Sequence, residues 1–253
     1  MDMDALTLLV DLHRDGARQG PGSDAITRQA MALAGLTPQA GLKIADIGCG
    51  TGASALLLAG DLEAEVTAVD LFPAFLDKLQ ARTAEAGLSS LITPVEASMD
   101  ALPFEPASLD VIWSEGAIYN IGFEAGIAAW KRFLKPGGLL AVSELSWFTA
   151  ERPAELEAYW SDQYPGVAPT SAKIAQLEEA GYTPVGYFPL PASAWLDQYY
   201  APTQARLPAF LDRHGHSEAA RTVVEMEQAE LAHFEAHHRY YGYGFYLARS
   251  PGP

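Results

Sequence analysis

The fold of this chain is decided by the stretch Ile44-Ala45-Asp46-Ile47-Gly48-Cys49-Gly50-Thr51-Gly52. Its small apolar and β-branched residues predict a short buried strand, and its alternating glycines predict a sharp turn that lets the backbone approach a ligand. A helix is predicted to start at Ser54, so that its N-terminus points into the turn. The next predicted strand ends at Asp70, whose carboxylate can accept hydrogen bonds from both hydroxyls of a ribose. Together these segments predict a nucleotide-binding half-site.

Two kinds of ligand fit such a half-site. The spacing Gly48-x-Gly50-x-x-Ala53 also matches the looser dinucleotide fingerprint, so the glycines alone leave the choice open. Asp46 precedes the first glycine by two positions, where a pyrophosphate needs neutral or positive surroundings. A carboxylate there favours a cationic ligand such as S-adenosylmethionine, which carries an ammonium and a sulfonium and has no phosphate.

Further along, three segments extend this pattern: Ser98-Met99-Asp100-Ala101-Leu102-Pro103-Phe104, Leu109-Asp110-Val111-Ile112-Trp113-Ser114 and Phe133-Leu134-Lys135-Pro136-Gly137-Gly138-Leu139-Leu140-Ala141-Val142. With the glycine-rich stretch they resemble, in order, the motifs of class I S-adenosylmethionine-dependent methyltransferases. The resemblance covers about residues 40–146 and is greatest to the ubiquinone/menaquinone C-methyltransferase-like group. It implies methyl transfer with S-adenosyl-L-methionine as cofactor.

The order of predicted elements indicates an α/β protein with a Rossmann-like, doubly wound sheet. We expect seven mostly parallel strands, one of them over about 138–144, with an antiparallel last strand and a helical C-terminal cover. Residues 1–36 are expected to form N-terminal helices and a lid, and residues 37–150 the cofactor-binding core. Residues 151–253 are expected to supply substrate-cover helices and the final two strands of the same domain, including one continuous helix over about 195–214.

The resemblance also implies which residues contact the cofactor: Arg18, Asp46, Gly48, Gly50, Gly52, Asp70, Leu71, Ser98, Met99, Ser114 and Glu115. Asp46 and the three glycines would hold the methionine part, and Asp70 would hold the ribose. Leu71 would cover one face of the adenine, and the pair Ser98-Met99 the other. Arg18 belongs to a turn-forming run, residues 18–23, that is interpreted as a lid. Its guanidinium would either pair with the cofactor's carboxylate or remain a solvated surface group.

Candidate catalytic residues follow the fourth strand of the core, where the family places the reactive methyl group. Glu115 could balance the sulfonium, orient an amine, accept a proton or simply brace the loop, and Tyr119 lies in the same segment. The aromatic residues concentrate beyond residue 145, which favours an aromatic-lined pocket, although any single one is more often core. The candidate substrate-binding residues are Asn120, Glu144, Trp147, Trp195 and Tyr199.

Composition and charge limit the kinds of molecule that this protein is expected to bind. The 253 residues carry a net charge of -16 and no cluster of Lys and Arg, which argues against a nucleic-acid substrate. No apolar run approaches the length of a membrane helix, and the N-terminus lacks the basic start of a signal peptide, so a cytoplasmic protein is expected. A homodimer is kept as an open alternative. No metal is expected, since Phe234 follows His233 where a zinc protease has its Glu.

The sequence therefore predicts a methyltransferase that uses S-adenosylmethionine to modify a small molecule by in-line methyl transfer. Two other classes stay open. A non-catalytic S-adenosylmethionine-binding protein would show the same cofactor motifs. A nicotinamide-dependent oxidoreductase would use the same half-site, but Asp46 and the absence of a Tyr-x-x-x-Lys pair disfavour it.

Overall fold

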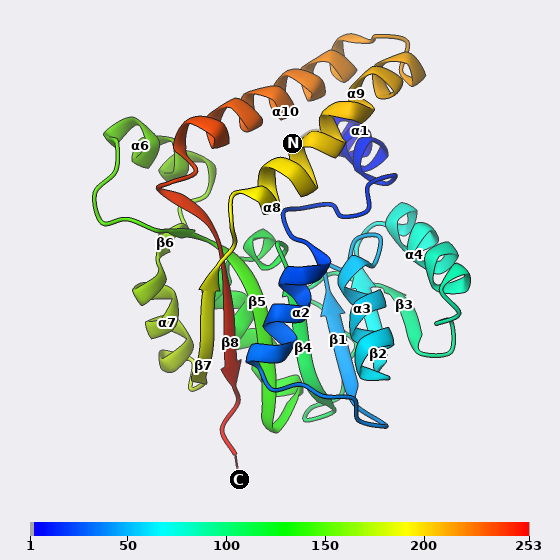
Figure 1. Cartoon of the computed structure of the whole chain (residues 1–253), viewed down its shortest axis with the longest axis vertical. Coiled ribbons are helices and arrows are strands. Elements are labelled where there is room, and N and C mark those ends of the chain that lie inside the picture. The colour runs from blue at the N-terminus through cyan, green and yellow to red at the C-terminus, as the bar shows by residue number, and fades with distance from the viewer. Residues whose placement is uncertain (1–2, 253) are drawn as a thin grey trace.

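Strands with apolar side chains on both faces form the centre of the molecule, which the computed structural model describes over residues 3–252 (Figure 1). In β1, Ile44 belongs to one hydrophobic cluster, whereas Ala45 and Ile47 belong to another on the opposite face. This double burial is typical of strands covered by helices on both sides. The strands are β1 (Lys43–Ile47), β2 (Glu65–Asp70), β3 (Ile92–Glu96), β4 (Leu109–Glu115), β5 (Leu134–Trp147), β6 (Ala168–Pro169), β7 (Thr183–Pro189) and β8 (Tyr241–Arg249).

The strand order is β3-β2-β1-β4-β5-β8-β7. The first five strands of this order pair in parallel, and β8 runs antiparallel to both β5 and β7. The expected doubly wound sheet with an antiparallel last strand is thereby confirmed. The two-residue β6, which pairs with the end of β5, adds an eighth strand that the sequence did not predict. From β1 the chain continues to β2 and β3 on one side of the sheet, and from β4 it continues to β5 on the other side. Such a change of side between β1 and β4 leaves a crevice at the carboxyl ends of these two strands.

Helices cover both faces of the sheet. On one face, α2 and α3 contribute Ile26 and Leu58 to the larger cluster, and on the other α5 and α7 contribute Ile127 and Leu177. The helices are α1 (Met3–His13), α2 (Asp24–Leu33), α3 (Ala53–Leu62), α4 (Pro73–Glu85), α5 (Phe123–Trp130), α6 (Ala154–Gln163), α7 (Thr170–Glu179), α8 (Ser193–Trp195), α9 (Ala201–Arg213) and α10 (Glu218–His237), with short turns η1 (Ile118–Asn120), η2 (Lys131–Phe133) and η3 (Leu196–Tyr200). In the described part of the chain, none of them is long and apolar enough to cross a membrane.

A helical cap lies across the carboxyl edge of the sheet. Figure 1 shows α9 and α10 at the top of the molecule with α1 beside them, and the β1 arrow points toward this layer. The three helices share a small cluster of their own, in which Leu12 of α1 meets Phe210 of α9 and Val223 of α10. The cap is therefore built from both ends of the sequence. It covers the edge at which α/β sheets bind ligands.

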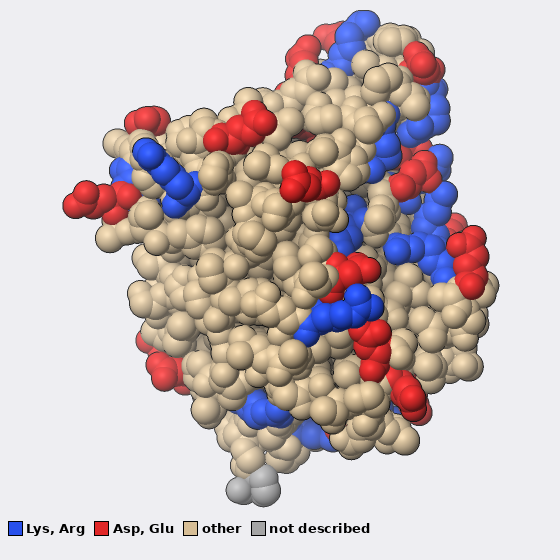
Figure 2. Space-filling model, viewed as in Figure 1, with Lys and Arg blue, Asp and Glu red and all other residues tan. Residues whose placement is uncertain are grey.

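Charged side chains of both signs mix along one margin of the molecule. On the face shown in Figure 2, Lys and Arg gather beside Asp and Glu over α1, α4 and α9, and most of the remaining surface is uncharged. Ion pairs account for part of this margin, including Arg213 with Asp11 (2.9 Å) and Lys78 with Asp15 (2.7 Å). The basic residues on this margin are thus held largely by the protein's own carboxylates.

Two predicted elements differ from the structure. The single helix expected over 195–214 is divided into α8, a π-helical turn at η3, and α9. The π-turn places the consecutive side chains Tyr199 and Tyr200 both in the interior, which a regular helix advancing about 100° per residue does less readily. Strand β5 begins at Leu134 rather than near 138, because Leu134 pairs with Leu109 before the register shifts.

The aromatic contact between β4, β7 and β8 gives a test of the core. Phe245 is fully buried, and its ring centroid lies 5.4 Å from those of both Trp113 and Phe188. Phe245→Ala should lower the free energy of unfolding by about 3–5 kcal/mol, measured by urea denaturation. Met226→Ala, at a side chain that is 49% exposed on α10, should change it by less than about 0.5 kcal/mol. Equal shifts for the two variants would contradict the packing described.

Candidate functional site

The glycine loop, residues 48–52, joins β1 to α3. Its three glycines all have positive φ, from +54° to +85°, a region that L-residues with side chains rarely adopt. A Cβ added at Gly48 would overlap the Cβ of Ala117, and one added at Gly52 would overlap the side chain of Leu79. The glycines are therefore required by close packing as well as by conformation, and the loop lies directly against the segment that follows β4.

Asp70 ties the glycine loop to the end of β2. Its Oδ2 accepts a hydrogen bond from the Gly50 N–H (2.8 Å), and its Oδ1 accepts one from the Phe72 N–H (3.0 Å). Burial raises the pKa of Asp70, while these backbone N–H donors act in the opposite direction. Each carboxylate oxygen keeps a further lone pair. Asp70 can thus hold the loop and still accept hydroxyl hydrogens from a ligand.

Asp46 is the buried acid beneath the loop. Its side chain is fully buried, and Oδ2 accepts a hydrogen bond from the Ser54 hydroxyl at the start of α3 (2.7 Å). Oδ1 has no hydrogen-bond partner among residues 3–252. Burial raises the pKa of Asp46 to about 7, and the nearby Glu115 carboxylate adds to this effect. The carboxyl group is therefore poised to ionise when a positive charge approaches.

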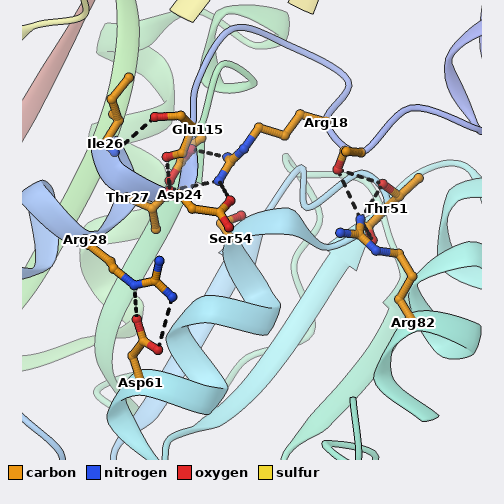
Figure 3. A network of polar contacts seen from close by, with 12 residues as sticks. Arg18, Asp24, Ile26, Thr27, Arg28, Thr51, Ser54, Asp61, Arg82 and Glu115 are labelled. Atoms are coloured by element: carbon orange, nitrogen blue, oxygen red, sulfur yellow. Dashed lines mark hydrogen bonds and ion pairs between the residues drawn. The ribbon is translucent and has the colours of Figure 1, made fainter. Parts of the chain in front are cut away.

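Glu115, at the end of β4, accepts hydrogen bonds from three donors. They are the Trp113 indole N–H (2.9 Å), the Thr27 hydroxyl (2.7 Å) and the Arg18 guanidinium (2.9 Å). Arg18 also donates to Asp24 and Thr27, so that it joins the N-terminal segment to α2 and β4, as Figure 3 shows. We call Arg18, Thr27 and Glu115 the clasp. Both charged side chains of the clasp are about nine-tenths buried, with 10% and 9% exposed.

The N-terminal segment, residues 13–22, lies over the glycine loop. The Gln19 side chain accepts a hydrogen bond from the Thr51 N–H (2.8 Å), and its amide donates to the carbonyls of His13 and Gly16. Arg82 of α4 donates to the carbonyls of Thr51 (2.8 Å) and Ala17 (3.1 Å). The sequence offered no signal for Gln19 or Arg82, because their contacts with Thr51 and Ala17 join segments that are far apart along the chain.

The residues expected around an adenine lie along the same edge. Leu71, directly after β2, is 54% exposed, and Ser98 and Met99 are half-buried after β3. The Met99 side chain is next to the glycine loop, 3.6 Å from where a Cβ on Gly48 would lie. Ser114 differs from them, because it is fully buried and donates to the Ile47 carbonyl (2.8 Å). Its hydroxyl holds β4 to β1.

Tyr119 and Asn120 occupy the η1 turn after β4. The Asn120 amide donates to the Ala117 carbonyl (2.9 Å), which closes the turn on itself. Tyr119 keeps 42% of its surface exposed, and its ring lies edge-on to that of Tyr164, with centroids 6.1 Å apart. Of these two candidates, Tyr119 is the one with a side chain available to a ligand.

Glu144 forms a buried ion pair that the sequence did not reveal. Its carboxylate lies 3.3 Å from the Lys173 ammonium of α7, and neither side chain is more than 1% exposed. Lys173 also donates to the Gly166 carbonyl (2.8 Å) and lies over the Phe123 ring. Burial raises the pKa of Glu144 and lowers that of Lys173. A single lysine in a mostly polar helix gave no sign that it would turn inward.

The other candidate substrate residues divide between two places. Trp147 lines a pocket of about 170 Å³ together with Arg152 and Trp160, on the side of α6. Trp195 and Tyr199 belong to the cap, where Trp195 stacks on Phe234 at 4.5 Å. Within residues 3–252, no three His, Cys, Asp or Glu side chains form a group that could hold a metal ion.

Comparison with known proteins shows what this chain is similar to. Residues 44–138 match the family model described as "Methyltransferase domain". Dimethylglycine N-methyltransferase of Parasynechococcus marenigrum is 33% identical over 123 residues, 48% of this chain and 44% of that protein. A ubiquinone/menaquinone biosynthesis C-methyltransferase of Allorhizobium ampelinum is 35% identical over 119 residues, 45% of this chain and 46% of that protein. The chain thus matches about half the length, or less, of these curated relatives.

A solved structure extends the likeness to the whole fold. The S-adenosylmethionine-dependent methyltransferase from Geobacter sulfurreducens, in complex with S-adenosyl-L-homocysteine, has a TM-score of 0.82 with 20% identity and covers 98% of both chains. The likeness to this structure shows a Rossmann-like fold. Within that fold, residues 44–138 match a methyltransferase domain, and the chain is similar to ubiquinone/menaquinone C-methyltransferases.

The clasp can be tested by a double-mutant cycle. Arg18→Met leaves the buried Glu115 carboxylate without its cation and should lower the free energy of unfolding by about 3 kcal/mol. Adding Glu115→Gln should recover part of this loss, giving a coupling energy of about 1–3 kcal/mol between the two sites. Denaturant titration of the single and double variants measures it.

An exposed ion pair provides the matched control for the cycle. Arg28 and Asp61 are paired at 2.6 Å, but their side chains are 51% and 36% exposed, so Arg28→Met should have little effect. Strict additivity of Arg18→Met and Glu115→Gln would show that the clasp does not couple the N-terminal segment to β4.

Proposed function

We propose that this protein transfers a methyl group from S-adenosylmethionine to a small molecule. The observation that carries the proposal is the glycine loop, which is hydrogen-bonded to Asp70, lies above the buried Asp46 and touches the segment after β4. These groups meet at the carboxyl edge of the sheet under the cap. The match of residues 44–138 to a methyltransferase domain supports the same reading.

The residues present fit a cationic nucleotide-like cofactor. Asp46 offers a buried carboxylate oxygen that no donor in the described chain occupies, and an ammonium group would satisfy it. A pyrophosphate in the same position would face this carboxylate, which disfavours a nicotinamide dinucleotide. Asp70 would hold the ribose, Leu71 and the pair Ser98-Met99 would enclose the adenine, and the glycine loop would leave room for the methionine backbone.

When bound, the cofactor supplies a methyl group on a positively charged sulfur; the acceptor's lone pair bonds to the methyl carbon as the carbon–sulfur electron pair returns to sulfur. The protein's residues then have to orient the acceptor and exclude water. The cap and the N-terminal segment would exclude water from above, because they cover the edge of the sheet and the glycine loop respectively.

Glu115 and Tyr119 take different parts in this proposal. Three donors already bind the Glu115 carboxylate, so we assign it to fixing Arg18 and the N-terminal segment rather than to accepting a proton. Arg18 is accordingly assigned to holding the N-terminal segment in place through its ion pair with Glu115. Tyr119 is exposed in the turn after β4 and is the candidate to contact the acceptor. The expected homodimer and cytoplasmic location stay predictions of the sequence.

Binding and turnover separate this proposal from its alternatives. Calorimetric titration with S-adenosylmethionine, S-adenosylhomocysteine and NADH should give binding for the first two and none for NADH. Formation of S-adenosylhomocysteine with a panel of small acceptors then distinguishes an enzyme from a non-catalytic binding protein. Binding of NADH alone would overturn the proposed function.

The ribose contact gives a quantitative prediction. Asp70→Ala should weaken binding of S-adenosylmethionine and S-adenosylhomocysteine alike, because a buried carboxylate acceptor is lost. Loss of such charged hydrogen bonds costs about 1.5–3 kcal/mol, or about tenfold to a hundredfold in affinity. Asp77→Ala, at an exposed position on α4, is the control and should bind as the wild type does. Unchanged affinity in Asp70→Ala would refute the ribose assignment.

Asp46 makes binding depend on pH. With its pKa raised to about 7 in the free protein, the carboxyl is mostly neutral at pH 6 and ionised at pH 8. Because a bound ammonium favours the ionised form, affinity for S-adenosylhomocysteine should increase as pH rises toward 7, by at most about tenfold per pH unit, and level off above it. Asp46→Asn should bind weakly and with little pH dependence. Calorimetry across this range would contradict the assignment if the wild-type profile were flat.

A further inference from the structure

Several tyrosine side chains from separate elements converge beneath α10, beside the end of β4. Tyr243 of β8 reaches the segment after β4, since a Cβ placed on Gly116 would lie 3.4 Å from its hydroxyl. Tyr119, Tyr164 and Tyr199 come from η1, the end of α6 and η3. We call these three residues, together with Tyr243, the tyrosine cluster. The 42% exposure of Tyr119 leaves the cluster open to solvent.

Two hydroxyls of the tyrosine cluster are left without partners by the protein. The side chains of Tyr199 and Tyr243 belong to residues that are only 9% and 7% exposed. Neither hydroxyl is hydrogen-bonded within the described chain, whereas the neighbouring Tyr200 hydroxyl donates to Glu230 (2.8 Å). Neither oxygen is among the fully buried atoms that lack a partner, so both hydroxyls remain accessible and can bind a polar ligand.

Glu230 supplies the charge of this site. It is an exposed residue of α10, and its carboxylate accepts a hydrogen bond from the Tyr200 hydroxyl (2.8 Å). The Tyr200 ring centroid lies 5.0 Å from that of Tyr199 and 6.1 Å from that of Trp195, so Glu230 lies at the edge of the tyrosine cluster. Two other acids nearby have partners of their own, since Glu144 pairs with Lys173 and Glu227 contacts the His13 imidazole (2.9 Å). Glu230 forms no ion pair with any residue of the segment 3–252. The Glu230 carboxylate, when ionised, is therefore an unpaired negative charge at the exposed edge of the site.

Aromatic faces complete the surroundings. Trp195 lies 4.7 Å from the Tyr243 ring and 4.5 Å from the Phe234 ring, measured between centroids. Its indole N–H is buried and has no acceptor among the described residues. Faces of Trp and Tyr attract cations, above all where water is partly excluded. An anionic ligand would instead meet Glu230.

We propose that the tyrosine cluster is the acceptor site, that it takes a molecule bearing a cationic amine, and that Glu230 is the counter-charge of that amine. This inference rests on the proposed methyl transfer, to which it adds the class of acceptor. Tyr243 brings the site next to Gly116, directly after the end of β4. For transfer, the ammonium loses a proton to water, and the nitrogen lone pair bonds to the methyl carbon while the carbon–sulfur pair returns to sulfur.

The test compares a cation with its neutral isostere. Choline and 3,3-dimethylbutan-1-ol have the same shape and differ in charge, and both are titrated calorimetrically into the protein with and without S-adenosylhomocysteine. Choline should bind at least tenfold more tightly than the alcohol. In Glu230→Gln, which keeps an acceptor for Tyr200, this preference should fall at least tenfold. Glu225→Gln, at an exposed position on the same helix, should leave it unchanged.

Hydroxyl deletion provides a second, independent measurement. Tyr199→Phe and Tyr243→Phe should each weaken choline binding about threefold to tenfold while leaving S-adenosylhomocysteine affinity intact. Equal binding of choline and the alcohol, no binding of choline, or a preference that survives in Glu230→Gln would overturn the inference. A protein that fails to bind S-adenosylhomocysteine would instead overturn the proposed methyl transfer, and the choline comparison on the free protein would still decide the cation site.

Discussion

The close approach of the glycine loop to the segment after β4 is the constraint on which the site depends. Gly48 has no side chain, so Ala117 can contact its backbone, and this contact brings the ends of β1 and β4 together. Everything proposed for the chemistry is positioned from these two strand ends. Asp46 and Asp70 lie on the loop's side, and Glu115 and Tyr119 lie on the other. A methyl side chain at position 48 would separate the two halves.

The charged side chains of the site are of two kinds, those with a partner of opposite charge and those without one. The clasp and the Glu144–Lys173 pair are closed networks in which each charge has a partner, and such networks fix the geometry of neighbouring elements more than they stabilise the fold. Asp46 and Glu230 each lack a cation, although they lie on different elements. Asp46 is buried and Glu230 is exposed on α10, and both carboxylates favour a positively charged ligand, in keeping with a cationic cofactor and the cationic acceptor that we propose.

The sequence predicted the sheet well because its signals are local. Each strand of the core carries its own apolar pattern and its own turn, so the order of strands followed from reading along the chain. The same holds for the glycine loop and Asp70, which are separated by a single helix. Lys173, Gln19 and Glu230 could not be found this way, because their roles arise from contacts with residues far away in sequence. The π-turn at η3 was missed for a different reason, since the composition of residues 195–214 suits an ordinary helix.

The π-turn also bears on how proteins of this fold diverge. A π-turn contains one residue more than the α-helical turn it replaces, so the loss of a single codon there would restore a regular helix. The residues before the deletion would keep their orientation, and those after it would rotate by about 100° about the helix axis. Tyr199 and Tyr200 would then no longer both face the interior. One small genetic event in the cap would change what the interior presents to a ligand, while the sheet and the glycine loop would be inherited intact.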